Sequence, residues 1–277
     1  MALLHTRQIL PAYRASLVIT LGWIGSMVVL PFVLLFITAM ELEWRELWQV
    51  MTNERVLHSI WLSLKLSALA ALFNLCFGTL TAWVLTRYQF WGKQFLNTLI
   101  DLPFALPTAV AGIVLATLYA PNGLFGQYFT HWDLQIAFTP LGILVALIFV
   151  SFPFTVRAVQ PVLAELDHSI EEAATTLGAN RLTIIRRVIL PTLYPAMISG
   201  AGMGFARSLG EYGSVIFIAG NVPLVSEIAP LIIMSKLDIY DVQGASAVAL
   251  FMLMISFMLL FSMNAFEKYV SRYMNKR

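Results

Sequence analysis

Residues 172–191 place glutamate, alanine and arginine side chains between two long apolar runs of the chain. The segment begins with Glu172-Ala173-Ala174, reaches Gly178 after three further residues, and ends with Val188-Ile189-Leu190-Pro191. These residues supply charge and apolar contact surface but no paired nucleophile and base, so their chemistry is that of recognition. A basic, polar loop of this length in an otherwise apolar chain indicates contact with a soluble partner.

The first part of this segment predicts a short helix. Ser169 and Glu172 have the spacing of a capping box, which places the start of the helix at Ile170. Gly178 stands where the C-terminus of a helix favours a residue in the left-handed conformation. The apolar positions on one face of this helix are Ile170, Ala173, Ala174 and Leu177.

A second helix is expected after the glycine, capped by Asn180 or Thr183. Its apolar side carries Leu182, Ile185, Val188 and Ile189. Pro191 and Pro195 then rigidify the return to the membrane. The sequence therefore predicts a helix-turn-helix knob with an exposed apolar face that fits a groove on another protein. The alternative is that Glu172 is only a cap and that the alanines only favour helix formation.

Two opposite charges lie inside the fifth apolar run. Arg207 and Glu211 have i, i+4 spacing, so their side chains can pair on one helix face and lower the cost of placing both in a membrane. Such a pair either lines a pathway or gate, or fixes the packing against a neighbouring helix, and both interpretations stay open. Gly200 and Gly204 on the same helix have the GxxxG spacing that allows close helix approach.

Asp101, Pro103 and Pro107 interrupt the third apolar run. Each proline lacks a backbone N–H, so this span is expected to break or kink, and Asp101 is expected to cap a helix beginning near Pro103. Irregular backbone inside a membrane is tolerated where it lines a cavity, which makes these three residues candidates for a pathway or gate. The alternative is a simple kink with Asp101 near the cytoplasmic interface.

The sequence contains no motif for covalent or hydrolytic chemistry. The fragment nearest to a P-loop is Gly92-Lys93-Gln94, which lacks the upstream glycine and the Ser or Thr after the lysine. No HExxH and no G-x-S-x-G occur, and His5, His58, His131 and His168 are scattered. We expect no catalytic residue, no metal site and no cofactor bound by this chain.

The composition is that of a polytopic membrane protein. Of 277 residues, 59% are hydrophobic and 12% are charged, about half the charged fraction typical of a soluble domain. The mean hydropathy is +0.80. A net charge of +2 gives no reason to expect nucleic-acid binding. The lone Cys76 lies in an apolar run and has no partner for an internal disulfide.

Six apolar runs are long enough to cross a bilayer as helices, so the fold class is all-α with six transmembrane helices. They are residues 15–40, 59–86, 95–119, 137–156, 196–218 and 244–266. Most arginines and lysines then fall on one side with both chain ends, while only Arg45, Arg55 and Lys236 fall on the other. The positive-inside rule places both termini and residues 172–191 in the cytoplasm.

The expected organisation has three parts. Residues 1–55 hold the first helix, residues 56–266 form a transmembrane domain with a cytoplasmic loop at 157–195, and residues 267–277 form a basic tail. The outer loops are mostly acidic and carry tryptophans that suit a membrane interface. Among them, residues 222–242 are too polar to span and predict a short outer helix or re-entrant turn after Pro223, or else a surface connector.

The spacing E-A-A-x3-G-x9-(I/V)-x-L-P, in a cytoplasmic loop of a six-helix chain, resembles the type I permease subunits of ATP-binding-cassette importers. The resemblance extends from the second to the sixth helix. It implies that the chain forms half of a translocation pathway in the bacterial inner membrane. It also implies that a cytoplasmic dimer of ATPase subunits consumes the ATP and grips the loop. The coupling residues would be Glu172, Ala173, Ala174, Gly178, Leu190 and Pro191.

Residues 101–112 and 207–221 are similar to the T-type permease subunits of sulfate/thiosulfate importers. This resemblance implies two further partners, a second permease subunit of the W type and an external sulfate-binding protein. Molybdate permeases carry similar segments, so a molybdate or tungstate permease of the same fold is an alternative. A further alternative is an ion-coupled secondary transporter that uses Arg207 and Glu211, which leaves the cytoplasmic knob unexplained.

Overall fold

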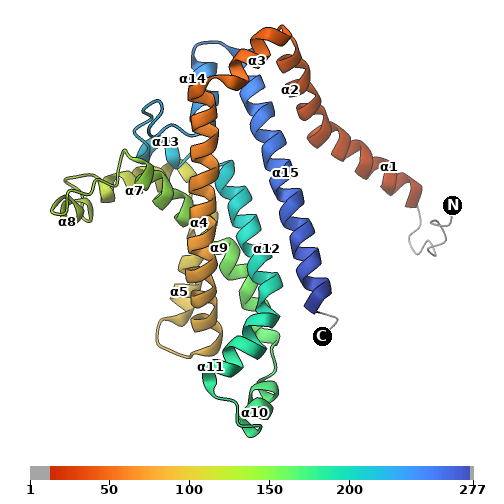
Figure 1. Ribbon diagram of the computed structural model, residues 1–277, viewed down its shortest axis with the longest axis vertical. Helices are drawn as coiled ribbons and strands as arrows, with labels where there is room; N and C mark the ends of the chain where they lie inside the picture. The colour runs from red at the N-terminus through yellow and green to blue at the C-terminus, as the bar shows by residue number, and fades with distance from the viewer. Residues whose placement is uncertain (1–12, 275–277) are drawn as a thin grey trace.

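The computed structural model describes residues 13–274, and all regular secondary structure in that range is helical (Figure 1). Five segments are long and apolar enough to cross a membrane: Ala15–Met40, Glu54–Arg87, Pro140–Glu165, Arg181–Leu209 and Val242–Met263. They correspond to the first, second, fourth, fifth and sixth predicted spans. The ends of the first span are as predicted, and the ends of the other four differ.

The first span consists of α1 (Tyr13–Ile24), a π-helical turn (Gly25–Val29) and α2 (Leu30–Met40). The other four spans are α4 (Glu54–Arg87), α9 (Pro140–Glu165), the helix Arg181–Leu209, and α15 (Val242–Met274). Figure 1 shows α1 and α2 leaving the bundle at an angle, and no part of the most apolar window of this span is buried inside the chain. An unburied apolar span of this length needs lipid or another protein to cover it.

The third predicted span is not a single helix. The chain instead forms α5 (Lys93–Ile100), α6 (Leu102–Ala105) and α7 (Thr108–Tyr119), with breaks next to Pro103 and Pro107. The prediction that the prolines interrupt this span is confirmed, because neither residue has a backbone N–H for a helical hydrogen bond. The short helix α8 (Gly126–Thr130) follows, and α7 and α8 extend sideways from the bundle (Figure 1).

The fifth span begins and ends earlier than the sequence predicted. Helix α11 (Arg181–Ile184), a π-helical turn (Ile185–Ile189) and α12 (Leu190–Leu209) form one continuous rod. The wide π-helical turn ends two residues before Pro191, whose ring would otherwise crowd the preceding turn of an α-helix. The rod stops before Gly210, and the chain then turns into the short helix α13 (Val215–Ile218).

Helices α4, α9 and α12 form the centre of the bundle. On α4, the buried Asn74 donates hydrogen bonds to Oγ of Ser151 (2.8 Å) and to the carbonyl of Ile148 (3.1 Å) on α9. A Cβ atom on Gly200 of α12 would lie 2.9 Å from Cα of Thr155 on α9. The small residue at this position therefore serves close helix packing within the chain, as its GxxxG spacing indicated.

The end of the bundle at the top of Figure 1, predicted to be the outer one, carries two short helices, α3 (Trp44–Thr52) and α14 (Ala229–Asp238). The short helix expected within residues 222–242 thus exists, and it begins at Ala229, six residues after Pro223. Pro230 stands in its first turn, where a missing N–H costs nothing. The N–H of Ala229 donates to Oγ of Ser63 at 2.8 Å, which fastens the start of α14 to α4.

Candidate functional site: the coupling knob and the interrupted spans

The predicted knob is present between α9 and α12, at the bottom of Figure 1. Its first helix, α10 (His168–Thr176), begins earlier than the capping box suggested. Asp167, not Ser169, caps it: Oδ1 of Asp167 accepts the N–H of Ser169 at 2.9 Å. The prediction of Ser169 as the cap was wrong because an aspartate two residues earlier is an equally good acceptor for the first free N–H groups.

The turn between the two helices has the expected chemistry. Gly178 has φ = +84°, the left-handed conformation predicted for it. Asn180 caps the second helix, because its Oδ1 accepts both the N–H and the hydroxyl of Thr183 at 2.8 Å. Nothing lies within 4 Å of the position where a Cβ on Gly178 would stand, so only backbone conformation restricts this position.

The apolar positions of α10 divide between two faces. Leu177 is 88% exposed, Ile170 is 46% exposed, and Ala173 is also exposed. Ala174 instead packs against the apolar cluster formed by the end of α9, α11 and the start of α12. The expectation that all four apolar residues share the docking face is therefore wrong for Ala174, since the knob needs an inward contact to hold its own position.

The remaining motif residues differ in exposure as well. Glu172 and Gly178 are exposed on the knob, whereas Leu190 and Pro191 are half-buried at the start of α12. Ile184 and Ile189 are buried in the apolar cluster, and Leu182 is exposed. The surface open to a partner thus consists of α10, the turn and Leu182, while the end of the motif forms the base beneath them.

An ion pair that the sequence did not indicate joins the knob to α4. Nη2 of Arg87, the last residue of α4, lies 2.6 Å from Oε1 of Glu171 on α10. The two side chains are 10% and 28% exposed. This pair and the apolar cluster together hold α10 against the membrane bundle.

Asp101 does not cap α6, which corrects the prediction for this residue. Its carboxylate instead forms a two-pronged ion pair with Arg157 of α9, at 2.8 Å to Nε and 2.5 Å to Nη2. The same guanidinium donates to Asn97 Oδ1 (3.0 Å) and to Gln160 Oε1 (2.7 Å). The planar guanidinium matches a carboxylate better than one free N–H does, so the interhelical pair wins over capping. It ties the break between α5 and α6 to the fourth span.

The two stretches at residues 101–112 and 207–221 meet in space. Helix α7 packs against α13, and a Cβ on Gly112 of α7 would lie 2.7 Å from Cα of Ser214. A Cβ on Gly213 would lie 3.2 Å from Cβ of Thr108, at the start of α7. Figure 1 shows α13 beside α7 at a level below the outer ends of α4 and α15. Two segments distant in sequence thus build one irregular region at depth in the bundle.

We expect Gly112→Ala to destabilise the protein strongly. Its new methyl group would lie 2.7 Å from Cα and 2.8 Å from the carbonyl carbon of Ser214, and backbone atoms cannot move aside cheaply. Overpacking of this kind costs up to about 3 kcal/mol. Thermal unfolding of the purified protein measures the loss, with Gly210→Ala as the control because nothing lies within 4 Å of its Cβ position. Equal melting temperatures for the two variants would contradict the close contact.

Arg207 and Glu211 form the predicted ion pair, with 2.7 Å between Nη1 and Oε2. The Glu211 side chain is 2% exposed and its Oε1 accepts the N–H (2.8 Å) and the hydroxyl (2.9 Å) of Ser214. The Arg207 side chain is 35% exposed. The carboxylate therefore fixes the turn between α12 and α13, while the guanidinium stays accessible.

A family model described as the binding-protein-dependent transport system inner membrane component matches residues 74–276. This match covers the knob and the two stretches, residues 101–112 and 207–221, that meet where α7 packs against α13. The chain belongs to this family. It is a multi-pass protein of the inner membrane, and the family is that of the transmembrane permease subunits of ATP-binding-cassette importers.

Two bacterial members of this permease family are similar to the whole chain. The sulfate transport system permease protein CysT of Salmonella typhimurium is 45% identical over 98% of this chain and 98% of its own length. The protein of the same name from Escherichia coli is 44% identical over 96% of each chain. The recognition of a type I importer permease that resembles the T-type subunits of sulfate importers is thereby confirmed.

Solved structures share the fold of this permease at low sequence identity. A bacterial importer of the acidic polysaccharide alginate matches with a TM-score of 0.77 and 16% identity, covering 92% of this chain and 94% of that one. The MetNI methionine ABC transporter in inward-facing conformations matches with a TM-score of 0.61 and 17% identity, covering 83% and 99%. These likenesses confirm the predicted fold class of the type I importer permease.

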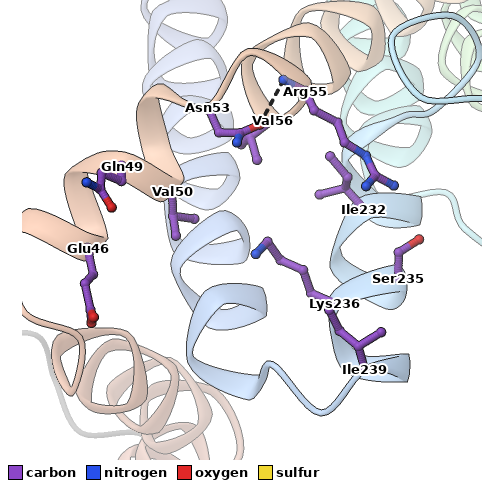
Figure 2. Close-up of a pocket in the computed structure, with 10 residues that line it drawn as sticks. All are labelled: Glu46, Gln49, Val50, Asn53, Arg55, Val56, Ile232, Ser235, Lys236 and Ile239. Carbon is purple, nitrogen blue, oxygen red and sulfur yellow. Dashed lines mark hydrogen bonds between the residues drawn. The ribbon is translucent and has the colours of Figure 1, made fainter.

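The end of the permease opposite the knob holds a cavity of about 460 Å³ between α3, α4 and α14. Figure 2 shows Arg55, Ser235 and Lys236 around it. Arg55 donates to both carboxylate oxygens of the buried Glu227, at 2.7 Å from Nε and 2.6 Å from Nη2. No sequence pattern indicated this pair, because its partners are 172 residues apart.

Asp241 anchors the start of the last span beside this cavity. It accepts the N–H of Gly244 at 2.9 Å and pairs with Lys236 at 2.7 Å. The hydrogen bond from Lys236, and then that from Gly244, lower the pKa of Asp241 below its ordinary 3.8. The stabilisation is therefore complete above about pH 4 and is lost as pH falls through the lowered pKa.

We accordingly expect Asp241→Ala to lower the stability by about 1 kcal/mol at pH 7, because the helix loses a cap and a partly exposed ion pair. The difference from the unsubstituted protein should shrink as the pH falls toward 3. Thermal unfolding in detergent at several pH values measures both effects. A difference that grew on acidification would contradict the assignment.

Within residues 13–274, no group of three or more His, Cys, Asp or Glu side chains is arranged to hold a metal ion, apart from side chains left undescribed. The functional features that sequence reasoning missed in this permease are all ion pairs between distant segments: Arg87 with Glu171, Asp101 with Arg157, and Arg55 with Glu227. Each member was visible as a charge near the end of an apolar run, but only the fold selects the partner.

Proposed function

We propose that this permease subunit imports sulfate or thiosulfate as half of a two-subunit pathway. The observation that carries the proposal is identity of 44–45% over nearly the full length with two bacterial permeases named for sulfate transport. The aligned region is nearly the whole chain and so includes residues 101–112 and 207–221, the two stretches that meet where α7 packs on α13. The likeness to these permeases therefore includes the segments that form the α7–α13 contact, as well as the coupling knob.

The knob couples this subunit to a cytoplasmic ATPase dimer, which hydrolyses the ATP, and the permease itself is non-catalytic. Exposed Glu172, Ala173 and Gly178 form the contact with the ATPase, and half-buried Leu190 and Pro191 form the base that passes its movement into α12. An exposed apolar Leu177 beside them supports this proposal, because a soluble groove is the only cover available to it outside the membrane. Both chain termini and the knob then lie in the cytoplasm, as the distribution of basic residues favours.

A second permease subunit, of the W type, completes the pathway. The unburied first span supports a partner inside the membrane, as does the accessible face of α12 around Arg207. A guanidinium at depth in the bundle cannot face lipid without large cost, so Arg207 faces water in the pathway or the other subunit. We assign Arg207 and Glu211 to the pathway wall, together with the break formed by Asp101, Pro103 and Pro107.

Because Glu211 neutralises the charge of Arg207, the pathway wall attracts an oxyanion only weakly. Weak binding allows the anion to pass through rather than remain bound. Selectivity then rests mainly with an external binding protein that delivers the anion. We propose that it docks on the outer rim formed by α3 and its flanks, where exposed Glu41, Glu43, Glu46 and Glu54 give an acidic surface. A complex with a periplasmic protein is described for the alginate importer of the same fold.

The experiment that tests the substrate is uptake of radiolabelled sulfate in cells with and without this gene, with excess molybdate as competitor. Loss of sulfate uptake on deletion, with little competition by molybdate, is the expected result. Strong competition by molybdate or tungstate would move the proposal to the related permeases. Uptake that survives ATP depletion but is abolished by an uncoupler would instead indicate an ion-coupled carrier.

A further inference from the structure

Helix α4 is held by an ion pair at each of its two ends. At the cytoplasmic end, Arg87 contacts Glu171 of the knob at 2.6 Å. At the outer end, Arg55 contacts Glu227, in the loop before α14, also at 2.6 Å. One uninterrupted helix of 34 residues therefore connects the cytoplasmic docking surface with the outer loop that holds Glu227. Arg55, at the outer end of this helix, also lines the cavity of Figure 2.

The inner pair is built to transmit displacement. Its arginine is 10% exposed and its glutamate 28%, so salt screens it less than a surface pair. The guanidinium of Arg87 also lies 6.0 Å from the centre of the Trp83 ring, which restricts its movement. A shift of α10 relative to the membrane bundle must therefore move the end of α4 or break the pair.

Neighbouring residues of α10 face in different directions. Glu172 and Ala173 are exposed toward the cytoplasm, whereas Glu171 is half-buried against Arg87. A protein that binds the exposed side leaves the contact with α4 intact. Glu172 and Ala173 are thus available to bind a partner protein, while Glu171 contacts α4 and can transmit the movement of α10 to it.

We propose that Arg87 and Glu171 are positioning residues of the transport cycle, through which movement of the coupling knob reaches α4 and then the outer loop at Arg55 and Glu227. This inference rests on the proposed coupling of the knob to an ATPase. It adds a second route for the movement, beside the continuous rod from α11 into α12. The two routes differ in chemistry, because only the route through α4 depends on charge.

The first test uses the complete importer in proteoliposomes and measures sulfate transported per ATP hydrolysed. Arg87→Gln and Glu171→Gln should each lower this ratio about tenfold, within the range of coupling between linked sites. Arg87→Lys keeps the charge and should retain most of the ratio. Glu165→Gln is the matched control, since it removes an exposed carboxylate at the nearby end of α9.

The second test reports on the outer end directly. In a Cys76→Ala background, a Ser235→Cys substitution places a single thiol beside the outer cavity. Trapping the ATPase with vanadate should change the labelling rate of this thiol when Arg87 is present and leave it nearly unchanged in the Arg87→Gln variant. A purely structural role for the pair would not produce this difference.

Several outcomes would overturn the proposal. Wild-type transport ratios in both glutamine variants would show that the pair passes no movement, as would an equal vanadate response at Ser235→Cys with and without Arg87. Loss of ATPase co-purification in the glutamine variants would assign the pair to assembly. If the unsubstituted importer itself failed to couple ATP hydrolysis to sulfate uptake, the proposed function would fail instead, which separates the two conclusions.

Discussion

A permease carrying Gly178→Leu is expected to reach the membrane in normal amounts and to transport almost no substrate. The residue has φ = +84°, a conformation that leucine adopts only at a cost of about 1–2 kcal/mol. A leucine would also project from the exposed turn between α10 and α11, directly on the surface we assign to the ATPase. Uptake assays combined with quantification of the protein in membranes measure the two properties separately.

The chain provides a matched control for this prediction. Gly92 also has φ = +84°, and nothing lies within 4 Å of its Cβ position either. Gly92→Leu introduces the same backbone strain in the loop between α4 and α5, outside the knob itself. Transport should survive this change. If both variants lost transport equally, backbone strain rather than loss of the ATPase contact would explain the result. Normal transport by Gly178→Leu would contradict the proposal that the knob binds the ATPase.

Removing Arg207 alone should damage the protein more than removing both members of its ion pair. Arg207→Met leaves the buried Glu211 carboxylate without its cationic partner, and breaking a buried pair in this way costs about 3 kcal/mol. In the double variant Arg207→Met/Glu211→Gln, the uncompensated charge disappears. The glutamine amide oxygen still accepts the hydrogen bonds from Ser214. Thermal unfolding of the two purified variants should therefore show a large drop for the single change and a small one for the double change.

Transport by the double variant then distinguishes the two roles that the sequence left open. A stable double variant with normal uptake would mean that the pair serves packing alone. A stable double variant with lost uptake is the outcome we expect for residues in the pathway wall. Equal stability of the single and double variants would show that Arg207 does not balance the charge of Glu211.

Local features of the knob were predictable because they depend on neighbouring residues. The left-handed Gly178, the cap at Asn180 and the spacing of the motif follow from short-range backbone chemistry. The start of α10 was misplaced for the same reason, because Asp167 and Ser169 are both good caps and only packing decides between them. Arg207 and Glu211 were paired correctly since i, i+4 spacing on one helix fixes their distance.

Features that depend on distant segments were not predictable. Asp101 was assigned to a cap because no sequence signal connects it to Arg157, which lies in another span. The exposed and buried sides of α10 were merged for a related reason, since helical periodicity identifies the apolar positions but not which of them the bundle covers. The third span was expected to break at its prolines, but its sideways course with α8 depends on contact with α13.

The length of α4 has a consequence for how the outer face meets other molecules. Its 34 residues extend about 51 Å at 1.5 Å per residue, whereas the hydrocarbon core of a bilayer is about 30 Å thick. About 20 Å of helix therefore extends beyond the hydrocarbon core, shared between its two sides. With its headgroup layers the bilayer is about 40–45 Å thick, so most of this excess crosses the headgroups and the α3–α14 surface lies at their outer edge. An external protein docking there should therefore respond to the charge of the lipid headgroups as well as to ionic strength.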